Sequence, residues 1–498
     1  MNIHDLVLLG ILFSSFVTGL VIFFLREESH RLRTWLNLLG AGLKLVLVLA
    51  LLWGVRRGET YAWSFTMAPG IEFALGADAN SVFFVTLSTL LWFWTTLYAV
   101  GYLEHSPQRS RFFGFFSLCV TATTGLALSA NLVTFLTFYE LLTVSTLPLV
   151  VHRGTADSLR AGKIYLAYTM GGGAVLLLAV AWLQSIAGPV AFTERGALAA
   201  VVAEHTDELR ILFFLFVAGL GVKAALVPLH GWLPKAMVAP APVSSLLHAV
   251  AVVKAGAFGI VRLVYDVYGV ETARDLGVLD PLLWLAAFTI VYGSVRALFQ
   301  DELKKRLAYS TVSQVSYIVM GTAIFGPLAT IGGIVHLVHQ GIMKITLFFA
   351  AGNYAETLGI HRVSQMNGVG RRMPWTTAAF TVGAFGMIGV PPLAGYVSKT
   401  YLQQGAENAG VEWVALVLGA SSLLNAAYFL PIVFRAWFLR PPEKWPEEQS
   451  FGRWETHWML LAPPLVTALL VIAAGVFAEA PFSPLNWARV ITAREYPE

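Results

Sequence analysis

Apolar residues dominate long stretches of the chain, and short polar segments separate these stretches. A helix needs about 20 mainly apolar residues to cross the roughly 30 Å hydrocarbon core of a membrane. Fourteen stretches of this kind can be counted, which predicts an all-α polytopic membrane protein with about 14 transmembrane helices. The predicted spans lie near residues 6–25, 36–54, 81–102, 112–130, 131–151, 164–187, 209–228, 243–266, 279–300, 307–325, 327–350, 375–400, 411–436 and 457–478.

The composition fits a protein surrounded by the lipid bilayer. Only 12% of the 498 residues are charged, about half the usual share for soluble domains, and 57% are hydrophobic. The single cysteine, Cys119, excludes a disulfide framework, a cysteine-ligated iron–sulfur cluster and a cysteine-based zinc site. The net charge of +4 is spread over short loops, which is not typical of nucleic-acid binding. We therefore expect no cofactor and no nucleic-acid partner.

The loop charges predict how the chain is oriented. Eighteen lysines and arginines, from Arg26 to Arg453, lie in loops that follow odd-numbered spans, whereas seven lie in loops on the opposite side. Cytoplasmic loops are enriched in lysine and arginine. Both termini are therefore expected on the outer side of the membrane.

The remaining eight basic residues lie at membrane depth, where a charge costs several kcal/mol and usually marks an ion or proton path. Four lie close enough to a span end for their long side chains to reach the interface: Lys44, Arg262, Arg296 and Arg435. The other four are deeper and are the candidates for function: Lys223, Lys254, Lys344 and Lys399.

Glu140 is the only acidic residue deep inside a predicted span. A lone carboxylate there would become protonated unless a cation faced it, and Lys223 is the natural partner. The alternative is a static ion pair that only fixes helix packing, although such pairs are often no more stabilising than apolar contacts.

Prolines interrupt two of the predicted spans beside buried lysines. Pro228 and Pro234 follow Lys223, and Pro391 and Pro392 precede Lys399. Proline cannot donate a helical hydrogen bond, and broken helices are tolerated at membrane depth where they line a cavity that water reaches.

Two broken helices in corresponding positions indicate an internal repeat. Helices 4–8 and 9–13 make two sets of five, and an odd number of crossings inverts the second set relative to the first. The sequence thus predicts N-terminal helices 1–3 (residues 1–111), two inverted five-helix repeats (112–268 and 269–436), and a loop with helix 14 (437–498).

Histidines accompany the lysines in two spans. His248 and Lys254 are six residues apart and do not share a helix face, so Lys254 is favoured for the path and His248 stays open between path and packing. His336, Gln340 and Lys344 repeat every four residues and form a polar stripe, with His339 beside it. Two histidines three residues apart, with no acidic or cysteine ligand nearby, make a poor metal site.

A run of three glycines, Gly171, Gly172 and Gly173, lies inside an apolar span with no strand before it. Close helix packing is therefore favoured over nucleotide binding.

The buried residues together predict a proton path. Burial favours the neutral form of a lysine and a nearby carboxylate favours the charged form, so changes at the carboxylate switch the lysine between holding and releasing a proton. The predicted row across the membrane midplane, linked by water, is Glu140, Lys223, Lys254, Lys344 and Lys399.

Four segments resemble the antiporter-like subunits shared by respiratory complex I, membrane-bound hydrogenases and Mrp-type cation/proton antiporters. These segments are KAALVPLHGWLP (223–234), APAPVSSLLH (239–248), LKKRLAYSTVSQVSY (303–317) and GVPPLAGYVSK (389–399). The resemblance covers spans four to thirteen. It implies fourteen helices with an inverted five-helix repeat, proton translocation along a hydrated axis, and a place in a prokaryotic inner (cell) membrane.

The resemblance also implies residue roles. Glu140 is similar to the family's fifth-span glutamate, Lys223 to its seventh-span lysine, Lys254 to its eighth-span station and Lys399 to its twelfth-span exit residue. Lysine at both 254 and 399 resembles the Mrp D-type or complex I N-type subunit more than the M-type. Many relatives carry histidine where this chain has Gln340, which cannot exchange a proton, so water or His336 must replace it.

Three functions stay open on this basis. The favoured one is the D-type subunit of a multisubunit Mrp-type antiporter that exchanges protons for Na⁺ or another monovalent cation. The second is a proton-pumping subunit of a complex I or hydrogenase assembly, and the third is a proton-coupled module for inorganic carbon uptake. The partners would be other hydrophobic subunits. The chain has no redox chemistry of its own, and the sequence leaves open whether it serves a redox enzyme.

Overall fold

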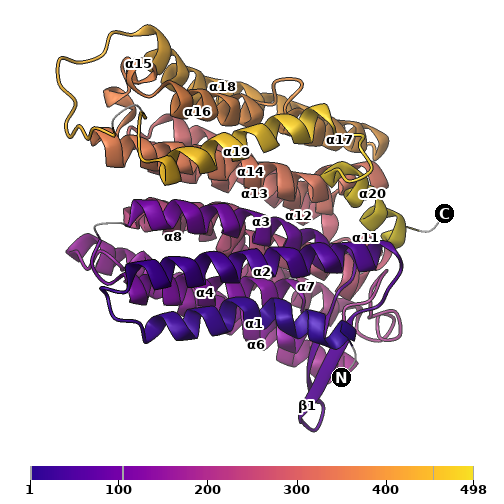
Figure 1. Ribbon diagram of the computed structural model, residues 1–498. Helices are drawn as coiled ribbons and strands as arrows, with labels where there is room; N and C mark the ends of the chain where they lie inside the picture. Colours follow the sequence, from indigo (N-terminus) through magenta and orange to yellow (C-terminus); the bar gives the residue numbers. More distant parts are fainter. Residues whose placement is uncertain (1–2, 104–105, 452–453, 497–498) are drawn as a thin grey trace.

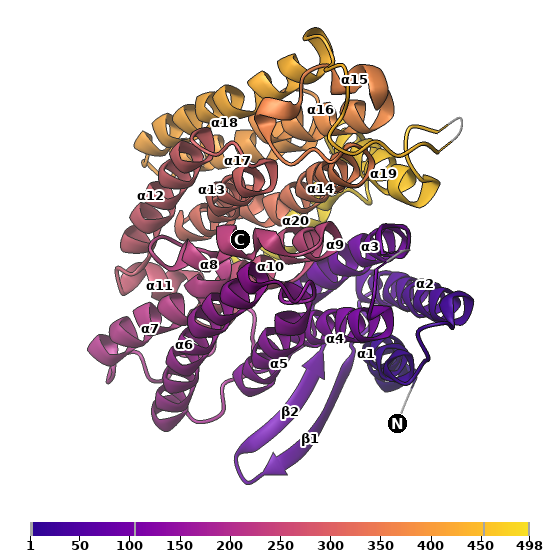
Figure 2. The same ribbon diagram turned by 90° about the vertical axis from the view of Figure 1, so that its left-hand side faces the viewer.

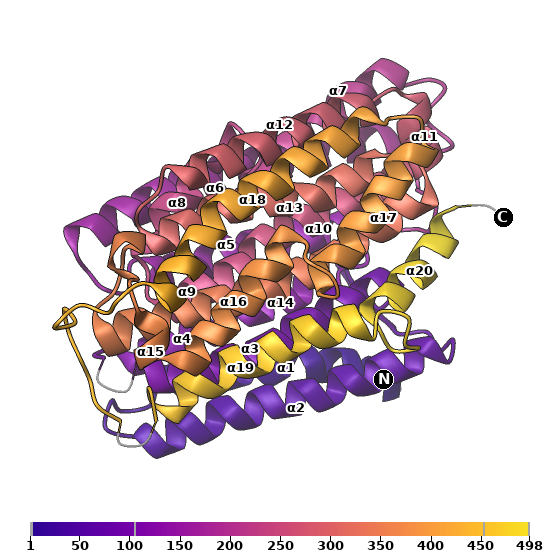
Figure 3. The same cartoon turned by 90° about the horizontal axis from the view of Figure 1, so that it is seen from above.

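The computed structural model describes residues 3–103, 106–451 and 454–496, so Arg453 of the orientation argument lies outside the described residues. Long helices run side by side in one bundle, and the two termini lie at the same end of it (Figures 1 and 3). A chain that crosses the membrane an even number of times, as predicted, has both termini on the same side. Which end faces the cytoplasm stays a prediction.

The prediction of an all-α polytopic membrane protein is confirmed. In the described part of the chain, eleven helices are long and apolar enough to cross a membrane. The other predicted spans are also helical, but they are more polar or are interrupted: α4 (Arg109–Ala127), α13 (Leu303–Ala323) and the pair α16 (Pro374–Ile388) and α17 (Ala394–Asn408). The number of crossings and the inverted repeat stay predictions.

The N-terminal part contains a β-hairpin that the hydropathy pattern did not predict. It extends beyond one side of the bundle, next to α1 and α5 (Figure 2), and its aromatic residues form a ladder in which the rings of Phe65 and Phe73 lie 5.4 Å apart. This part comprises α1 (Ile3–Phe23), α2 (His30–Arg56), β1 (Ala62–Ala68), β2 (Ile71–Gly76) and α3 (Ala79–Tyr102).

Polar side-chain caps set the starts of two helices in the middle of the chain. Asn131 accepts a hydrogen bond from the backbone of Thr134 at 2.8 Å, and Thr155 accepts one from Ser158 at 3.2 Å. After α4 this region contains α5 (Leu132–Val150), α6 (Ala156–Ala187), α7 (Thr206–Ala224), η1 (Leu229–Gly231), α8 (Trp232–Lys235), η2 (Ala236–Val238), α9 (Ala241–Ser245), η3 (Leu246–Val250), α10 (Val252–Arg262) and η4 (Leu263–Tyr268).

Helix α14 is the centre of the second part of the bundle and is almost wholly buried. It packs against α13, α16, α17 and α19, and also against α3 from the N-terminal part. Besides α13, α16 and α17 this part contains α11 (Val270–Asp275), α12 (Leu279–Leu298), α14 (Pro327–Leu358), η5 (Val363–Gln365), α15 (Val369–Arg372), α18 (Trp413–Phe438), α19 (Trp458–Val476) and α20 (Pro484–Glu495).

Both predicted helix breaks are present. Helix α7 ends where Ala225 adopts a left-handed backbone, and the Trp232 indole donates to the carbonyl of Val222 at 2.7 Å, which also accepts from the Ala225 N–H. Helix α16 ends at Gly389, which is also left-handed, and α17 resumes five residues later. Each break thus leaves backbone carbonyls open to side chains inside the bundle.

Candidate functional site

Lys223 lies in the last turn of α7 and is fully buried. Its ammonium group donates to the backbone carbonyl of Tyr139 on α5 and lies 3.4 Å from the centre of the Tyr139 ring. Lys223 and Glu140 interact electrostatically. No direct ion pair joins them among the described side chains, and Glu140 Oε1 is buried without a hydrogen-bond partner.

Glu140 and Lys223, expected from the sequence to be partners, therefore interact electrostatically without a direct ion pair. The reason is local: Tyr139 precedes Glu140 and offers a carbonyl that the lysine reaches first. A carboxylate that forms no ion pair with the lysine can change its distance from the ammonium group, which a static ion pair cannot.

The glycine run on α6 packs as predicted at two of its three positions. A Cβ atom at Gly173 would collide with the Glu140 carboxylate, and one at Gly172 would lie 2.7 Å from a Val222 methyl group. Gly171 faces open space. Because Gly173 has no side chain, the Glu140 carboxylate can occupy the space beside it.

Lys254 of α10 is fully buried and donates to the carbonyl of Leu337 on α14 at 2.7 Å. It follows the π-helical turn η3, in which Ala251 N–H bonds to the Leu246 carbonyl. Such turns occur often at functional sites. His248 lies in η3, and its ring stacks on Phe348 of α14 at 4.5 Å.

His336 of α14 lies near two of the predicted lysines, the buried Lys254 and the half-buried Lys399. Its Nδ1 is 2.8 Å from the Ser398 hydroxyl on α17, and its ring stacks on Tyr317 of α13. It is within electrostatic range of Lys254 on one side and Lys399 on the other, and His339 is also near. His336 therefore joins α10, α14 and α17 in one ionisable cluster.

Lys344 points from α14 toward the start of α13. Its ammonium group donates to the Leu307 carbonyl at 3.1 Å and to the Ser310 hydroxyl. Gln340, one turn before, is buried, and neither atom of its amide has a protein partner in the described chain. The structure thus gives Gln340 no direct relay to Lys344.

Lys399 follows the second helix break and binds the end of α16. Its ammonium group donates to the carbonyls of Met387 at 3.1 Å and Ile388 at 2.8 Å, and to the Ser422 hydroxyl at 2.9 Å. These carbonyls have no helical partner, and the helix dipole adds to their attraction for a cation.

The predicted row falls into two groups. Lys254 and Lys399 are each in electrostatic range of His336, and Lys344 is in electrostatic range of Lys254, although no hydrogen bond joins these side chains directly. Between Lys223 and Lys254 no hydrogen bond or ion pair is found in the described chain, although Gly256 of α10 packs against the Lys223 backbone.

Lys44 corrects one expectation from the sequence. It was expected to reach the interface, but it is fully buried, and it donates to the hydroxyls of Ser15 at 2.6 Å and Thr124 at 2.9 Å. Helix α2 begins at His30, well before its apolar run, so Lys44 lies about 18 Å or more from either helix end. The hydropathy pattern did not show that α2 extends several residues before the apolar run that begins near residue 36.

Of the three arginines expected near span ends, Arg262 is fully buried inside the protein. It forms ion pairs with Asp78 at 2.5 Å and Asp266 at 3.0 Å, which fix the end of α10. Arg296 is exposed near the end of α12, and Arg435 is partly exposed near the end of α18. These two agree with the expectation.

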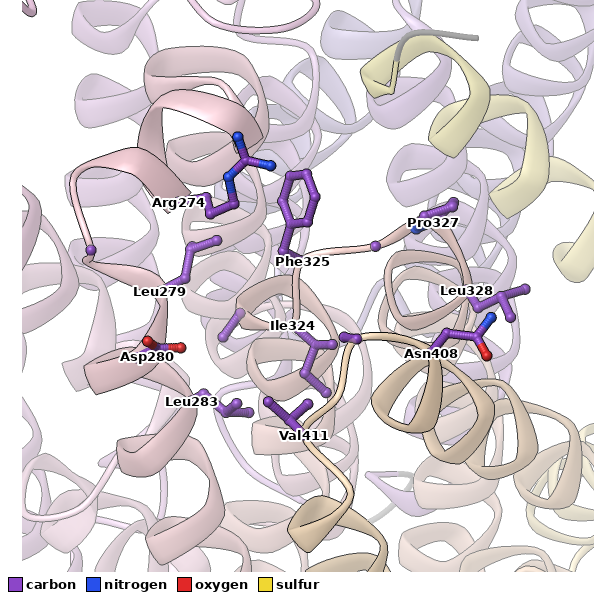
Figure 4. Close-up of a pocket in the computed structure, with 14 residues that line it drawn as sticks. Arg274, Leu279, Asp280, Leu283, Ile324, Phe325, Pro327, Leu328, Asn408 and Val411 are labelled. Carbon is purple, nitrogen blue, oxygen red and sulfur yellow. The ribbon is translucent and has the colours of Figure 1, made fainter.

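A cavity of about 530 Å³ opens at the end of the bundle that carries the termini (Figure 4). Arg274 and Phe325 line it from different segments, and the guanidinium lies 4.3 Å from the ring centre. Asp280 and Asn408 add polar groups to the wall. None of the predicted path residues lines this cavity. The described residues also contain no group of three or more histidine, cysteine or acidic side chains placed to hold a metal ion.

Residues 129–425 match the family described as NADH:quinone oxidoreductase/Mrp antiporter, transmembrane. The chain belongs to this family. The chain is 33% identical to NADH-quinone oxidoreductase subunit N of Desulforudis audaxviator (strain MP104C) over 438 residues, which cover 85% of this chain and 86% of the relative.

Two further comparisons within the family extend over nearly the whole chain. The D-type subunit of the Na(+)/H(+) antiporter of Alkalihalophilus pseudofirmus is 26% identical over 480 residues, 96% of this chain and 94% of the relative. A chain of the Mrp complex from Dietzia sp. DQ12-45-1b has the same fold, with a TM-score of 0.87 at 22% identity over 100% of this chain and 98% of that chain. The family predicted from the four segments is thereby confirmed.

Proposed function

We propose that this chain is a proton-translocating subunit of a multisubunit Mrp-type antiporter, which exchanges protons for Na⁺ or another monovalent cation. One observation carries the proposal: His336 bonds to Ser398, the neighbour of Lys399, and Lys254 binds the carbonyl of Leu337, the neighbour of His336. Ionisable groups from α10, α14 and α17 therefore lie together inside the bundle. The near full-length match to the D-type subunit of a Na(+)/H(+) antiporter supports the choice of complex.

In this proposal Glu140 controls the first step. Movement of its carboxylate toward or away from Lys223 changes how firmly the lysine holds a proton. Lys254, His336, Lys344 and Lys399 then pass protons through the second part of the bundle. Many relatives carry a proton-exchanging histidine at the position of Gln340, and in this chain His336 performs that role.

Water completes the connections in this proposal. Several side chains near the cluster have buried polar atoms without a protein partner, and such atoms are normally satisfied by ordered water. Water chains would link Lys223 to Lys254 as well. The side chains concerned are His248, Gln314, Tyr317, His336 and Gln340.

The proposed location is the inner membrane of a prokaryotic cell, with both termini outside and with hydrophobic partner subunits. In this proposal residues 112–268 and 269–436 are the inverted repeats, each with one broken helix. The test is proton-coupled cation transport by the intact complex in inverted vesicles. Transport that depends on Lys223 supports the proposal, and transport unchanged in a Lys223→Met variant contradicts it.

A second candidate is the corresponding subunit of a redox-driven complex. The 33% identity to an NADH-quinone oxidoreductase subunit N favours it. Proteins that purify with the chain in mild detergent decide between the two. Flavin or iron–sulfur subunits would contradict the antiporter, whereas small hydrophobic subunits alone would support it.

A further inference from the structure

A second cavity, of about 540 Å³, opens at the end of the bundle away from the termini. Its wall combines apolar residues with polar and charged ones, among which Tyr102, His152, Arg153 and Glu356 line it from three separate segments. Under the predicted orientation this end faces the cytoplasm. The cavity is therefore placed where protons from the inner solution first meet the protein.

Glu356 is the acidic group of this cavity. It lies in the last turn of α14, is half-buried, and faces the Tyr102 hydroxyl. Charged groups from three other segments act on it, namely Arg153, Lys304 and Glu447.

His152 is not the proton acceptor of the cavity at neutral pH. Burial, with the nearby charges of Arg111 and Arg153, lowers the pKa of His152 to about 4, and Glu27 acts weakly in the opposite direction. The imidazole is thus neutral near pH 7.

Lys304 lies between Glu356 and the interior of the bundle. Its ammonium group donates to the Ala239 carbonyl at 2.6 Å and reaches the Ser244 hydroxyl at 3.4 Å. Ser244 is one turn before His248, and Lys304 is in electrostatic range of both His248 and Glu356. It is therefore placed to exchange protons in either direction.

Helix α14 connects the same cavity to the buried cluster. Lys344, Phe348, Gly352 and Glu356 follow at intervals of four residues and make a stripe about 18 Å long that winds slowly around the helix. His248 stacks on Phe348 in the middle of this stripe and is in electrostatic range of Lys344. The stripe thus extends the predicted row from the midplane to the surface.

We propose that this cavity takes up protons from the inner solution and that Glu356 and Lys304 pass them to His248 and Lys344. A hydronium ion gives its proton to the Glu356 carboxylate and leaves water. The proton then moves to the neutral Lys304 amine, to the His248 imidazole and to the Lys344 amine, and each donor returns to its starting form.

The charges favour a proton over a bound metal cation as the ligand. The positive charge of Arg153 acts on Glu356 and would repel a resident Na⁺. A proton neutralises the carboxylate and needs no further ligands.

The inference rests on the proposed function, and one experiment separates the two. The intact complex with Glu356→Gln, in inverted vesicles, is assayed for proton-coupled transport while the pH on each membrane face is varied separately. We expect transport to fall about tenfold at neutral pH and its pH profile on the cavity side alone to shift by about one unit toward acid, because more protons are then needed to load the path. Glu443→Gln removes an exposed carboxylate in the loop after α18 that is not among the groups acting on Glu356; it is the matched control and should not shift the profile.

Two controls make every outcome decisive. Lys223→Met should be inactive at every pH, and if it is active the proposed function fails. If Lys223→Met is inactive while Glu356→Gln follows the unmodified protein at every pH, the uptake site is wrong. A changed Na⁺ dependence without a shifted pH profile also overturns it. Where Glu356→Gln does not reach the membrane, Lys304→Gln is tested with the same expected shift and the same contrary result.

Discussion

The Lys223 ammonium group donates its hydrogen bond to the backbone carbonyl of Tyr139, one residue before Glu140, and not to the Glu140 carboxylate. A direct buried ion pair would hold both charges in one place. The observed arrangement keeps the two groups electrostatically coupled while leaving the carboxylate without a hydrogen-bond partner at Oε1. This is the arrangement that a switch requires.

The room around Glu140 can be tested at Gly173. In Gly173→Ala the new methyl group would collide with the Glu140 carboxylate and displace it. We expect proton-coupled transport to decrease by about tenfold to 100-fold, since misplacing a reacting group by about 1 Å has effects of this size. Transport in vesicles, normalised to the amount of protein in the membrane, is the measurement.

Gly171→Ala is the matched control, because a Cβ atom there meets nothing within 4 Å. The control should transport like the unmodified protein. Equal transport by both alanine variants would show that the position of the Glu140 carboxylate does not matter.

His336 should be needed for proton transfer rather than for packing. In His336→Asn the amide retains a hydrogen bond to Ser398 but cannot carry a proton, so we expect transport to fall about tenfold or more. Ser398→Ala removes the same hydrogen bond and keeps the imidazole, so its effect should be smaller. Normal transport by His336→Asn would exclude the relay between Lys254 and Lys399.

The pH dependence of stability should have a component from Glu495 at the end of α20. Burial raises the pKa of Glu495 to about 7; Glu194 and Asp78 add to this effect, and the Arg195 N–H and Arg262 oppose it. Between about pH 4.5 and 7 the folded protein keeps a proton that the unfolded chain has released, so stability decreases as pH rises through this window.

Glu495→Gln is neutral at every pH and should remove this loss. Its unfolding temperature in detergent should equal that of the unmodified protein at pH 4 and exceed it at pH 8 by on the order of a few degrees. In Glu479→Gln the exposed carboxylate that Arg489 holds at a lowered pKa is replaced, and no such gain is expected. A gain for Glu495→Gln that is the same at both pH values would contradict the assignment.

Much of the fold could be predicted from the sequence because lipid imposes simple requirements. Apolar runs of spanning length gave the helices, and Pro228 and Pro391 gave the two breaks. The β-hairpin was missed because residues 62–76 alternate in the manner of a strand over too short a length for a hydropathy count.

The site was predictable as a set of residues but not as a set of contacts. Burial of Lys223, Lys254 and Lys344 followed from their depth in apolar runs. The sequence did not show that the Lys223 ammonium group would donate to the Tyr139 carbonyl, because the acceptor that a flexible side chain reaches depends on tertiary packing. Lys44 was misplaced because α2 extends beyond its apolar run in the N-terminal direction.

The misplaced residue also provides the best control for the central claim. Lys44 and Lys223 are both fully buried lysines, but the partners of Lys44 are Ser15, Thr124 and the ring of Trp92, away from the proposed path. Replacing either lysine by methionine removes one buried charge and leaves a similar volume. A general effect of lost charge should therefore be the same in both variants.

The most direct measurement is proton-coupled transport by the intact complex in inverted vesicles carrying Lys223→Met or Lys44→Met at equal abundance. We predict that Lys223→Met abolishes transport and that Glu140→Gln abolishes it as well. Lys44→Met should retain transport. Full transport by Lys223→Met, or equal loss in both lysine variants, would contradict a proton path through Glu140 and Lys223.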